Sequence, residues 1–236
     1  MGFLDLKIKA KISQRPLDII YVIDTSASMD GKKIQTVNTA MHELEELLRS
    51  EARKNPNAQV NVRILTFGGS TSKWHLAEKT DVESFKYNDI TQVSGMTPLG
   101  HALGELCYAF DNRNMPERGL KPIVVLLSDG MPNDDWEPNL ERFLSLPWGR
   151  KALKIAIAIG KDADRNSLSR FTTDPEMVLD ANTTTNLKNF IKWTSTLVTH
   201  NSKDIREKDE NGKMIAAALK LPVAVPVHSD NSSEII

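Results

Sequence analysis

Two nearly continuous apolar runs constrain the fold of this chain most strongly. LDIIYVID covers residues 17–24, PIVVLLS covers 122–128, and each run leads directly into a polar loop. Runs of this kind, rich in Ile and Val, are typical of strands that are buried on both faces of a sheet. Because such strands need helices above and below them, the two runs predict an α/β domain.

The rest of the chain alternates between strand and helix patterns. Apolar residues recur at helical spacing over 32–53, from about Thr97-Pro98 to Phe110, and over 136–145, 164–171 and 186–199. Further strands are expected at 59–67, 152–159 and 177–180, with a short antiparallel strand at 73–78 and a polar, loop-rich stretch at 80–96. The order predicts a doubly wound, Rossmann-like, mostly parallel sheet with one antiparallel edge strand and helices on both faces.

The expected domain organisation is simple. An N-terminal extension (1–15) precedes one domain (16–200), and a C-terminal tail (201–236) follows it. The tail has a charged beginning, an apolar middle and a polar end. We expect it to be flexible; an added edge strand and a segment that docks on a partner are the alternatives.

Composition excludes several classes of function. The formal net charge is −1 with both signs mixed along the chain, which is unlike the basic footprint of a nucleic-acid-binding protein. Cys107 is the only cysteine, so an internal disulfide or a zinc site built on several thiolates is excluded. No apolar run approaches the roughly 18 residues of a membrane span, and the N-terminus has no signal-peptide pattern. We therefore expect a cytoplasmic protein with no nucleic-acid or membrane partner.

Oxygen-bearing side chains stand where the apolar runs end. Asp24 ends the first run, and Ser26 and Ser28 follow it in the sequence DTSAS. Asp129 follows the second run, and Thr97 lies between them in GMTPLG. Loops at the carboxyl ends of parallel strands form the binding sites of open α/β sheets, so we expect these five side chains to meet there.

The five side chains offer two carboxylates and three hydroxyls, with no sulfur or imidazole. Hard oxygen donors suit Mg²⁺, with Mn²⁺ or Ca²⁺ as alternatives. Mg²⁺ retains water readily, which fits a site with few direct protein ligands. The sequence therefore predicts one divalent cation, with Mg²⁺ favoured.

The pattern Asp-x-Ser-x-Ser, a later Thr and then Asp-Gly resembles the metal-ion-dependent adhesion site of von Willebrand factor type A (vWA) domains. One departure is Ala27, where the family commonly has Gly. The resemblance implies that the two serines and the threonine contact the metal directly and that the two aspartates act largely through water. It also implies a protein-binding module without enzymatic activity, in which a partner's Asp or Glu completes the coordination.

Within this family the chain looks most like the bacterial cytoplasmic TerY-type proteins linked with tellurite resistance and stress. The segments that carry this likeness are PLDIIYVIDTSASM, GMTPLGHAL and VVLLSDGMPND. The likeness implies a signalling system with a protein kinase or phosphatase as partner.

Two other functions remain open. The first is a Mg²⁺-dependent phosphoryl-transfer enzyme with Asp24 as nucleophile. That mechanism needs a second carboxylate where Ser26 stands, and no lysine is obviously placed to balance a phosphate. The second is a scaffold with a vestigial metal site.

Structural roles are the alternatives for individual residues. Asp24 or Thr97 could cap the helix that follows it, and Asp129-Gly130 could be only a turn. Other residues near these loops are expected to serve structure: a turn at Asp30-Gly31, solvated loop acids at Asp134 and Asp135, core packing for Trp136 and Trp148, and a buried thiol at Cys107.

Overall fold

The structure is a computed structural model that describes residues 14–200, 221–222 and 236. Its strands are β1 (Arg15–Asp24), β2 (Ala58–Gly68), β3 (Thr71–Asp81), β4 (Ile123–Ser128), β5 (Leu153–Ile159) and β6 (Val178–Ala181). They form one sheet in the order β3-β2-β1-β4-β5-β6. All neighbours pair in parallel except β2 and β3, which are antiparallel. The predicted fold class, including the antiparallel edge strand, is confirmed.

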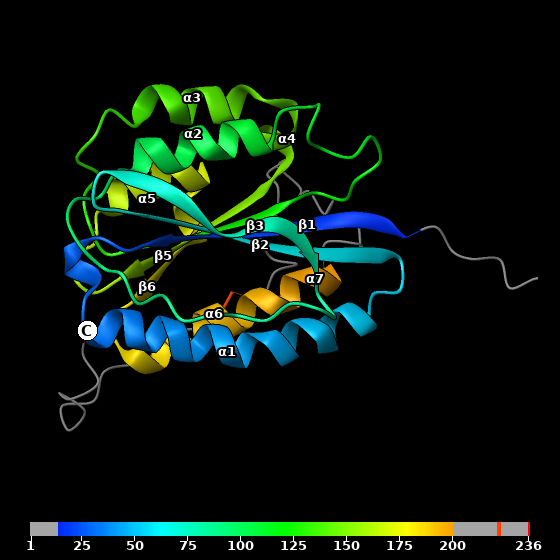
Figure 1. The fold of residues 1–236 in the computed structure, drawn as a ribbon, viewed down its shortest axis with the longest axis horizontal. Helices are drawn as coiled ribbons and strands as arrows, with labels where there is room; N and C mark the ends of the chain where they lie inside the picture. The colour runs from blue at the N-terminus through cyan, green and yellow to red at the C-terminus, as the bar shows by residue number, and fades with distance from the viewer. Residues whose placement is uncertain (1–13, 201–220, 223–235) are drawn as a thin grey trace, which may run out of the picture.

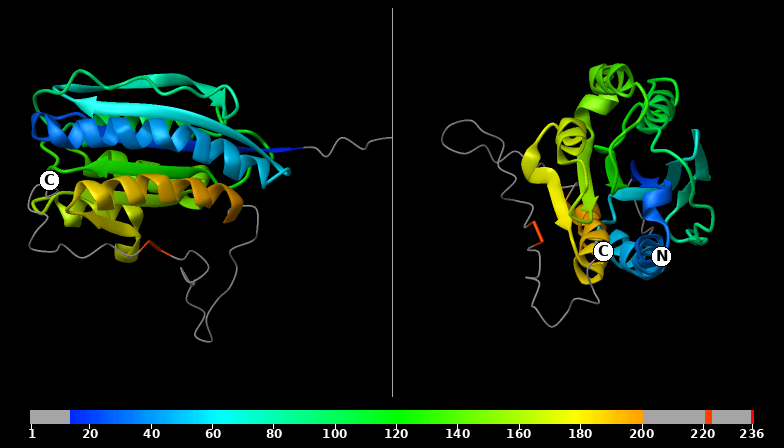
Figure 2. Two further views of the ribbon diagram at one scale, coloured as in Figure 1. Left: turned by 90° about the horizontal axis from the view of Figure 1, so that it is seen from below. Right: turned by 90° about the vertical axis from the view of Figure 1, so that its left-hand side faces the viewer.

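Helices cover both faces of this sheet. They are α1 (Lys32–Arg53), α2 (Leu99–Ala109), α3 (Glu137–Ser145), α4 (Pro147–Lys151), α5 (Arg165–Thr172), α6 (Thr184–Trp193) and α7 (Leu197–His200). One layer contains α1, α6 and α7, and the opposite layer contains α2, α3, α4 and α5 (Figure 1). The right-hand view of Figure 2, seen from one end, separates the same layers.

The core consists of two halves because β1 alternates its apolar side chains between the two faces. Ile19, Tyr21 and Ile23 pack in the half that includes α1 and α6. Ile20 and Val22 pack in the half that includes α2, α3 and α5. Burying a large apolar side chain fully contributes about 1.5–3 kcal/mol, so this two-sided burial fixes β1 at the centre of the sheet.

The structure corrects some predicted boundaries. The antiparallel strand is longer than predicted, and α4, which follows Leu146 in extended conformation, had no separate prediction. The single helix expected over 186–199 is divided into α6, a 3-10 turn at Thr194–Thr196 and α7. Hydroxyls in that turn bond to carbonyls three residues earlier, Thr194 Oγ1 to Ile191 among them, and such bonds compete with regular helix.

Most of the predicted extension (1–15) and tail (201–236) lies outside the described residues, so their expected boundaries and flexibility stay predictions. Among the helices that the structure describes, none combines the length and hydropathy needed to cross a membrane.

Candidate metal centre

The site lies where the sheet changes its direction of winding. From β1 the chain passes through α1 to β2 on one side, whereas β4 pairs on the other side. Loops after two such strands diverge and leave room for a ligand at their carboxyl ends. Asp24 is the last residue of β1, and Asp129 follows Ser128, the last residue of β4. The fold therefore places the two predicted acids at adjacent strand ends.

Asp24 organises the first loop from a fully buried position. Its Oδ1 accepts a hydrogen bond from the backbone N–H of Ser26 at 2.8 Å. Its Oδ2 accepts one from the Ser128 hydroxyl at 2.6 Å. The Oγ atoms of Ser26 and Ser28 lie 3.1 Å apart. The two serines of DTSAS thus point their hydroxyls to one place.

Asp129 joins the second loop to the first. Its Oδ1 accepts a hydrogen bond from the Ser28 hydroxyl at 2.8 Å. Its Oδ2 lies 2.6 Å from the Nζ of Lys33, in the first turn of α1. The alternative of a mere turn at Asp129-Gly130 does not account for these two contacts, because both depend on the carboxylate.

Close backbone contact brings the third loop to the first. Gly95 has φ +70°, and a Cβ on it would lie 2.6 Å from the Cα of Gly69. Only glycine fits there without displacing the neighbouring backbone. The Gly95 carbonyl accepts a hydrogen bond from the N–H of Ala27, which lies between the two serines. The loop that carries Thr97 is therefore fastened to DTSAS directly.

Thr97 lies beside the other candidate ligands. A Cβ built on Gly130 would be 3.2 Å from Thr97 Oγ1 and 3.7 Å from Ser28 Oγ. The hydroxyls of two separate loops thus border the space beside Gly130. All five residues predicted from the sequence meet at this edge of the sheet; their role as ligands stays a prediction.

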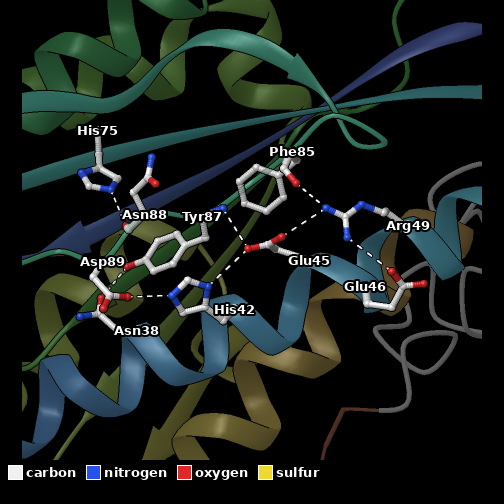
Figure 3. Close-up of polar contacts among 10 residues, drawn as sticks. All are labelled: Asn38, His42, Glu45, Glu46, Arg49, His75, Phe85, Tyr87, Asn88 and Asp89. Carbon is white, nitrogen blue, oxygen red and sulfur yellow. Dashed lines mark hydrogen bonds and ion pairs between the residues drawn. The ribbon is translucent and has the colours of Figure 1, made fainter.

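Helix α1 also holds the irregular segment that leads to Thr97 (Figure 3). The Asn38 Oδ1 accepts hydrogen bonds from the Tyr87 hydroxyl and from the N–H of Ile90. His42 Nε2 lies 2.8 Å from Asp89 Oδ1, and the His42 ring meets Tyr87 edge-on. Although 82–98 has no regular secondary structure beyond isolated bridges at Gly95 and Met96, these contacts give its approach to the site a fixed path.

The cap alternatives for the site residues are wrong. Gly31 occupies the N-cap position of α1, and Pro98 occupies the N-cap position of α2. Pro98 therefore lies just before α2, whereas the sequence predicted it as the first helical residue. The N–H groups of Gly100 and His101 donate instead to the Asp134 carboxylate, at 3.0 and 3.2 Å. Asp134 is therefore a helix cap and not the solvated loop acid that was expected.

The structure confirms the other expected structural roles. Asp30 and Gly31 form the expected turn. Trp136 and Cys107 are buried, and Trp148 packs against the same half of the core.

Two residues at the site were missed by sequence reasoning. Ser128 bonds to Asp24 because β1 and β4 pair with Ile23 opposite Leu127. Lys33 reaches Asp129, so a lysine lies at this site although the sequence showed none obviously placed to balance a phosphate. The β1–β4 pairing would have indicated Ser128, whereas nothing in the sequence distinguishes Lys33 from the adjacent Lys32.

Burial dominates the electrostatics of Asp24. Removal from water raises the pKa of its carboxyl from 3.8 to about 6, although hydrogen bonds from Ser128 and Ser26 lower it in part. The charge of Asp129 adds a smaller upward effect. Two carboxylates at one buried place thus repel each other, which is the electrostatic condition that a bound cation relieves.

This shift predicts a pH-dependent stability for the metal-free protein. The folded state retains the Asp24 proton in a range where the unfolded chain has lost it, so protonated Asp24 favours folding. That contribution is fully present below pH 3.8 and is lost as the pH rises through about 6. We expect the unfolding free energy of wild type, relative to Asp24→Asn, to fall from pH 4 to pH 7 in chelator. Urea denaturation at both values measures it, and a pH-independent difference would contradict it.

The donor set fits a hard divalent cation. Within the described part of the chain, no three His, Cys, Asp or Glu side chains cluster tightly enough to hold a metal by themselves. The hydroxyls of Ser26, Ser28 and Thr97 would therefore have to supply ligands beside the two carboxylates. Neutral hydroxyls, carboxylates and water together match the preferences of Mg²⁺.

Known proteins resemble this chain in sequence and in fold. The chain is 25% identical over 174 residues to human inter-alpha-trypsin inhibitor heavy chain H6; the match covers 66% of this chain and 12% of that protein. The chain thus corresponds to a small part of that relative. A pilus adhesin, SpaC from Lactobacillus rhamnosus GG, has a similar fold with a TM-score of 0.61, at 16% identity over 80% of this chain and 31% of the adhesin.

A third relative was solved with a metal. Proximal thread matrix protein 1 from the mussel byssus was solved with zinc in its metal-ion-dependent adhesion site (MIDAS) motif. Its fold is similar to that of this chain, with a TM-score of 0.53. It is 22% identical, and the match covers 82% of this chain and 49% of that one. The model of the von Willebrand factor type A domain family matches residues 18–193. By this match over most of its length, the chain belongs to the von Willebrand factor type A domain family.

Proposed function

We propose that this protein is a metal-dependent protein-binding module whose domain spans 16–200. The observation that carries the proposal is the convergence of three hydroxyls and two buried carboxylates from three loops. Ser26, Ser28 and Thr97 would hold the cation directly, and Asp24 and Asp129 would hold it largely through water. A bound Mg²⁺, or Mn²⁺ or Ca²⁺ in its place, supplies the positive charge that attracts a carboxylate of the partner.

The surface around these loops supports a protein ligand. Leu47, Met96, Tyr108 and Met131 are the large apolar side chains that the described residues expose. Two of them flank the site: Met96, 56% exposed, precedes Thr97, and Met131, 71% exposed, lies two residues after Asp129. Methionine is common at binding surfaces because its side chain adapts to different partners. A hollow of about 460 Å³ lies beside the loop that follows β4, with Asp134 of that loop and Gly100 of α2 in its wall.

The burial of Asp24 argues against the enzyme alternative. A phosphoryl-transfer nucleophile must be accessible to its substrate. Asp24 is 0% exposed, and both of its carboxylate oxygens already accept hydrogen bonds. We therefore propose a binding role without catalysis.

We further propose that the partner belongs to a bacterial stress or tellurite-resistance signalling system and is a protein kinase or phosphatase. This finer proposal rests on the TerY-like segments PLDIIYVIDTSASM, GMTPLGHAL and VVLLSDGMPND. The cytoplasmic location stays a prediction as well.

Affinity capture with quantitative mass spectrometry tests the proposal. Wild type is compared with Asp24→Ala, each with Mg²⁺ and with chelator. We expect to capture the same specific partner only with wild type in Mg²⁺. Asp24 is needed to hold the cation, and the cation supplies the positive charge that the partner recognises. Capture of that partner in chelator, at the same yield, would refute the metal-dependent mode.

A neighbouring acid provides the matched control. Asp30 is exposed in the same loop, and its carboxylate accepts a local hydrogen bond from the N–H of Gly31. Asp30→Ala removes one negative charge without removing a candidate ligand, so its capture profile should equal that of wild type.

A further inference from the structure

A lysine contacts the candidate metal centre from within the chain. Lys33 places its Nζ 2.6 Å from Asp129 Oδ2. The Asp129 side chain is fully buried, and the Lys33 side chain is only 23% exposed. The other oxygen of Asp129 accepts the Ser28 hydroxyl. This ion pair is thus part of the same hydrogen-bonded unit as the candidate ligands.

The location of the ammonium group restricts what it can do. A Cβ built on Gly160, just after β5, would lie 3.6 Å from Lys33 Nζ and 3.1 Å from the main-chain oxygen of Ile236. The ammonium therefore lies over the ends of β4 and β5, beside Asp129 and not out in solvent. Its charge acts at short range and through partly desolvated surroundings, where Coulomb interactions are stronger than in bulk water.

The charge balance of the site depends on this lysine. Asp24 and Asp129 bring two negative charges, and the two positive charges of one divalent cation balance them. A centre with no net charge attracts an incoming carboxylate less strongly than a positive centre does, even though the cation itself is positive. Counted over Asp24, Asp129, the divalent cation and Lys33, the charges sum to one positive unit, which favours an anion.

We propose that Lys33 is a positioning residue that sets the charge of this site: it weakens divalent-cation binding and strengthens carboxylate binding to the loaded site. The first effect arises because the ammonium competes with the cation for Asp129. The second arises because the ammonium leaves the loaded site positive. The inference rests on the proposed metal-binding function and assigns a partner-selecting role to a residue outside the five candidate ligands.

The opposite signs separate this role from a merely structural one. If Lys33 only kept the loops in shape, its loss would weaken cation and carboxylate binding together. A residue that sets charge moves the two affinities in opposite directions.

The experiment measures both affinities on the same variants. The Mg²⁺ Kd is obtained by calorimetry, and the acetate Kd of the Mg²⁺-saturated protein by ¹⁵N NMR titration. For Lys33→Met we expect Mg²⁺ to bind about tenfold more tightly and acetate about tenfold more weakly, as expected for loss of one nearby charge at intermediate dielectric. Lys33→Arg, which retains the charge, should restore both affinities to within about twofold of wild type.

Matched variants make the result decisive. Lys32→Met removes the same charge from the adjacent, exposed position of α1 and should leave both affinities near wild type. Lys33→Gln repeats the charge loss with a polar end, in case Lys33→Met folds poorly. Changes of the same sign, or no change, in a folded Lys33 variant would overturn the inference alone. Failure of wild type to bind Mg²⁺ would overturn the proposed function and the inference with it.

Discussion

Asp24→Ala is expected to abolish the thermal stabilisation that Mg²⁺ or Mn²⁺ confers on the wild-type protein. A ligand that binds only the folded state stabilises it by about 2.7 kcal/mol at a hundredfold excess over Kd. For a domain of this size that corresponds to a rise in Tm of roughly 5–11 °C. Differential scanning calorimetry, with millimolar metal against chelator, measures the rise in both proteins.

The physical reason lies in the two hydrogen bonds of the carboxylate. Without Asp24, the Ser26 N–H and the Ser128 hydroxyl lose their acceptor, so DTSAS loses the contact that aims its hydroxyls. Unsatisfied buried donors cost about 1–3 kcal/mol each, so the variant should also be less stable in chelator. The diagnostic quantity is therefore the metal-induced difference within each protein and not the absolute Tm.

Two controls give this experiment a clear outcome. Ser26→Ala should also remove the rise because it deletes a candidate direct ligand, whereas Asp30→Ala should retain it. A full metal-induced rise in Asp24→Ala would place the cation elsewhere. No rise in wild type at millimolar metal would instead favour a scaffold with a vestigial site.

The candidate ligands could be predicted because their signal is local. Asp24 and Asp129 each follow an apolar run that can only be a buried strand, and parallel strands bring their carboxyl ends to one edge. Thr97 needed more than local reasoning, because its approach depends on the contact between Gly69 and Gly95. The resemblance to the family motif indicated that Thr97 belongs to the site, but it did not explain how Thr97 comes close to the other residues.

The residues that were missed depend on long-range geometry. Whether Lys33 or Lys32 faces Asp129 is decided by the rotation of α1 about its axis, which helical spacing alone does not fix. Asp134 caps a helix that begins 35 residues earlier in the chain, so no local capping pattern indicates it. Polar contacts between distant segments are determined by packing, and packing is what a strand-and-helix pattern omits.

Gly68→Ala is expected to destabilise the protein by about 3 kcal/mol and to weaken Mg²⁺ binding at least about tenfold. A Cβ on Gly68, at the end of β2, would lie 2.4 Å from both the carbonyl oxygen and the Oγ1 of Thr25. That carbonyl accepts a hydrogen bond from Ser94 N–H, and Thr25 N–H donates to Phe67 O. Thr25 cannot move away without disturbing both neighbouring loops, and it stands between Asp24 and Ser26.

A second glycine shows whether the contact or the methyl group itself is responsible. Gly104 lies inside α2, and a Cβ there would have Asn139 Nδ2 as its nearest neighbour at 3.6 Å, an ordinary contact. Because alanine favours a helix over glycine, Gly104→Ala should be neutral or stabilising by up to about 1 kcal/mol and should leave the Mg²⁺ Kd unchanged. Urea denaturation and calorimetric titration measure both variants. Equal stability and equal Mg²⁺ affinity of Gly68→Ala and Gly104→Ala would contradict this prediction. The first metal-binding loop would then not depend on the close packing of β2 against Thr25.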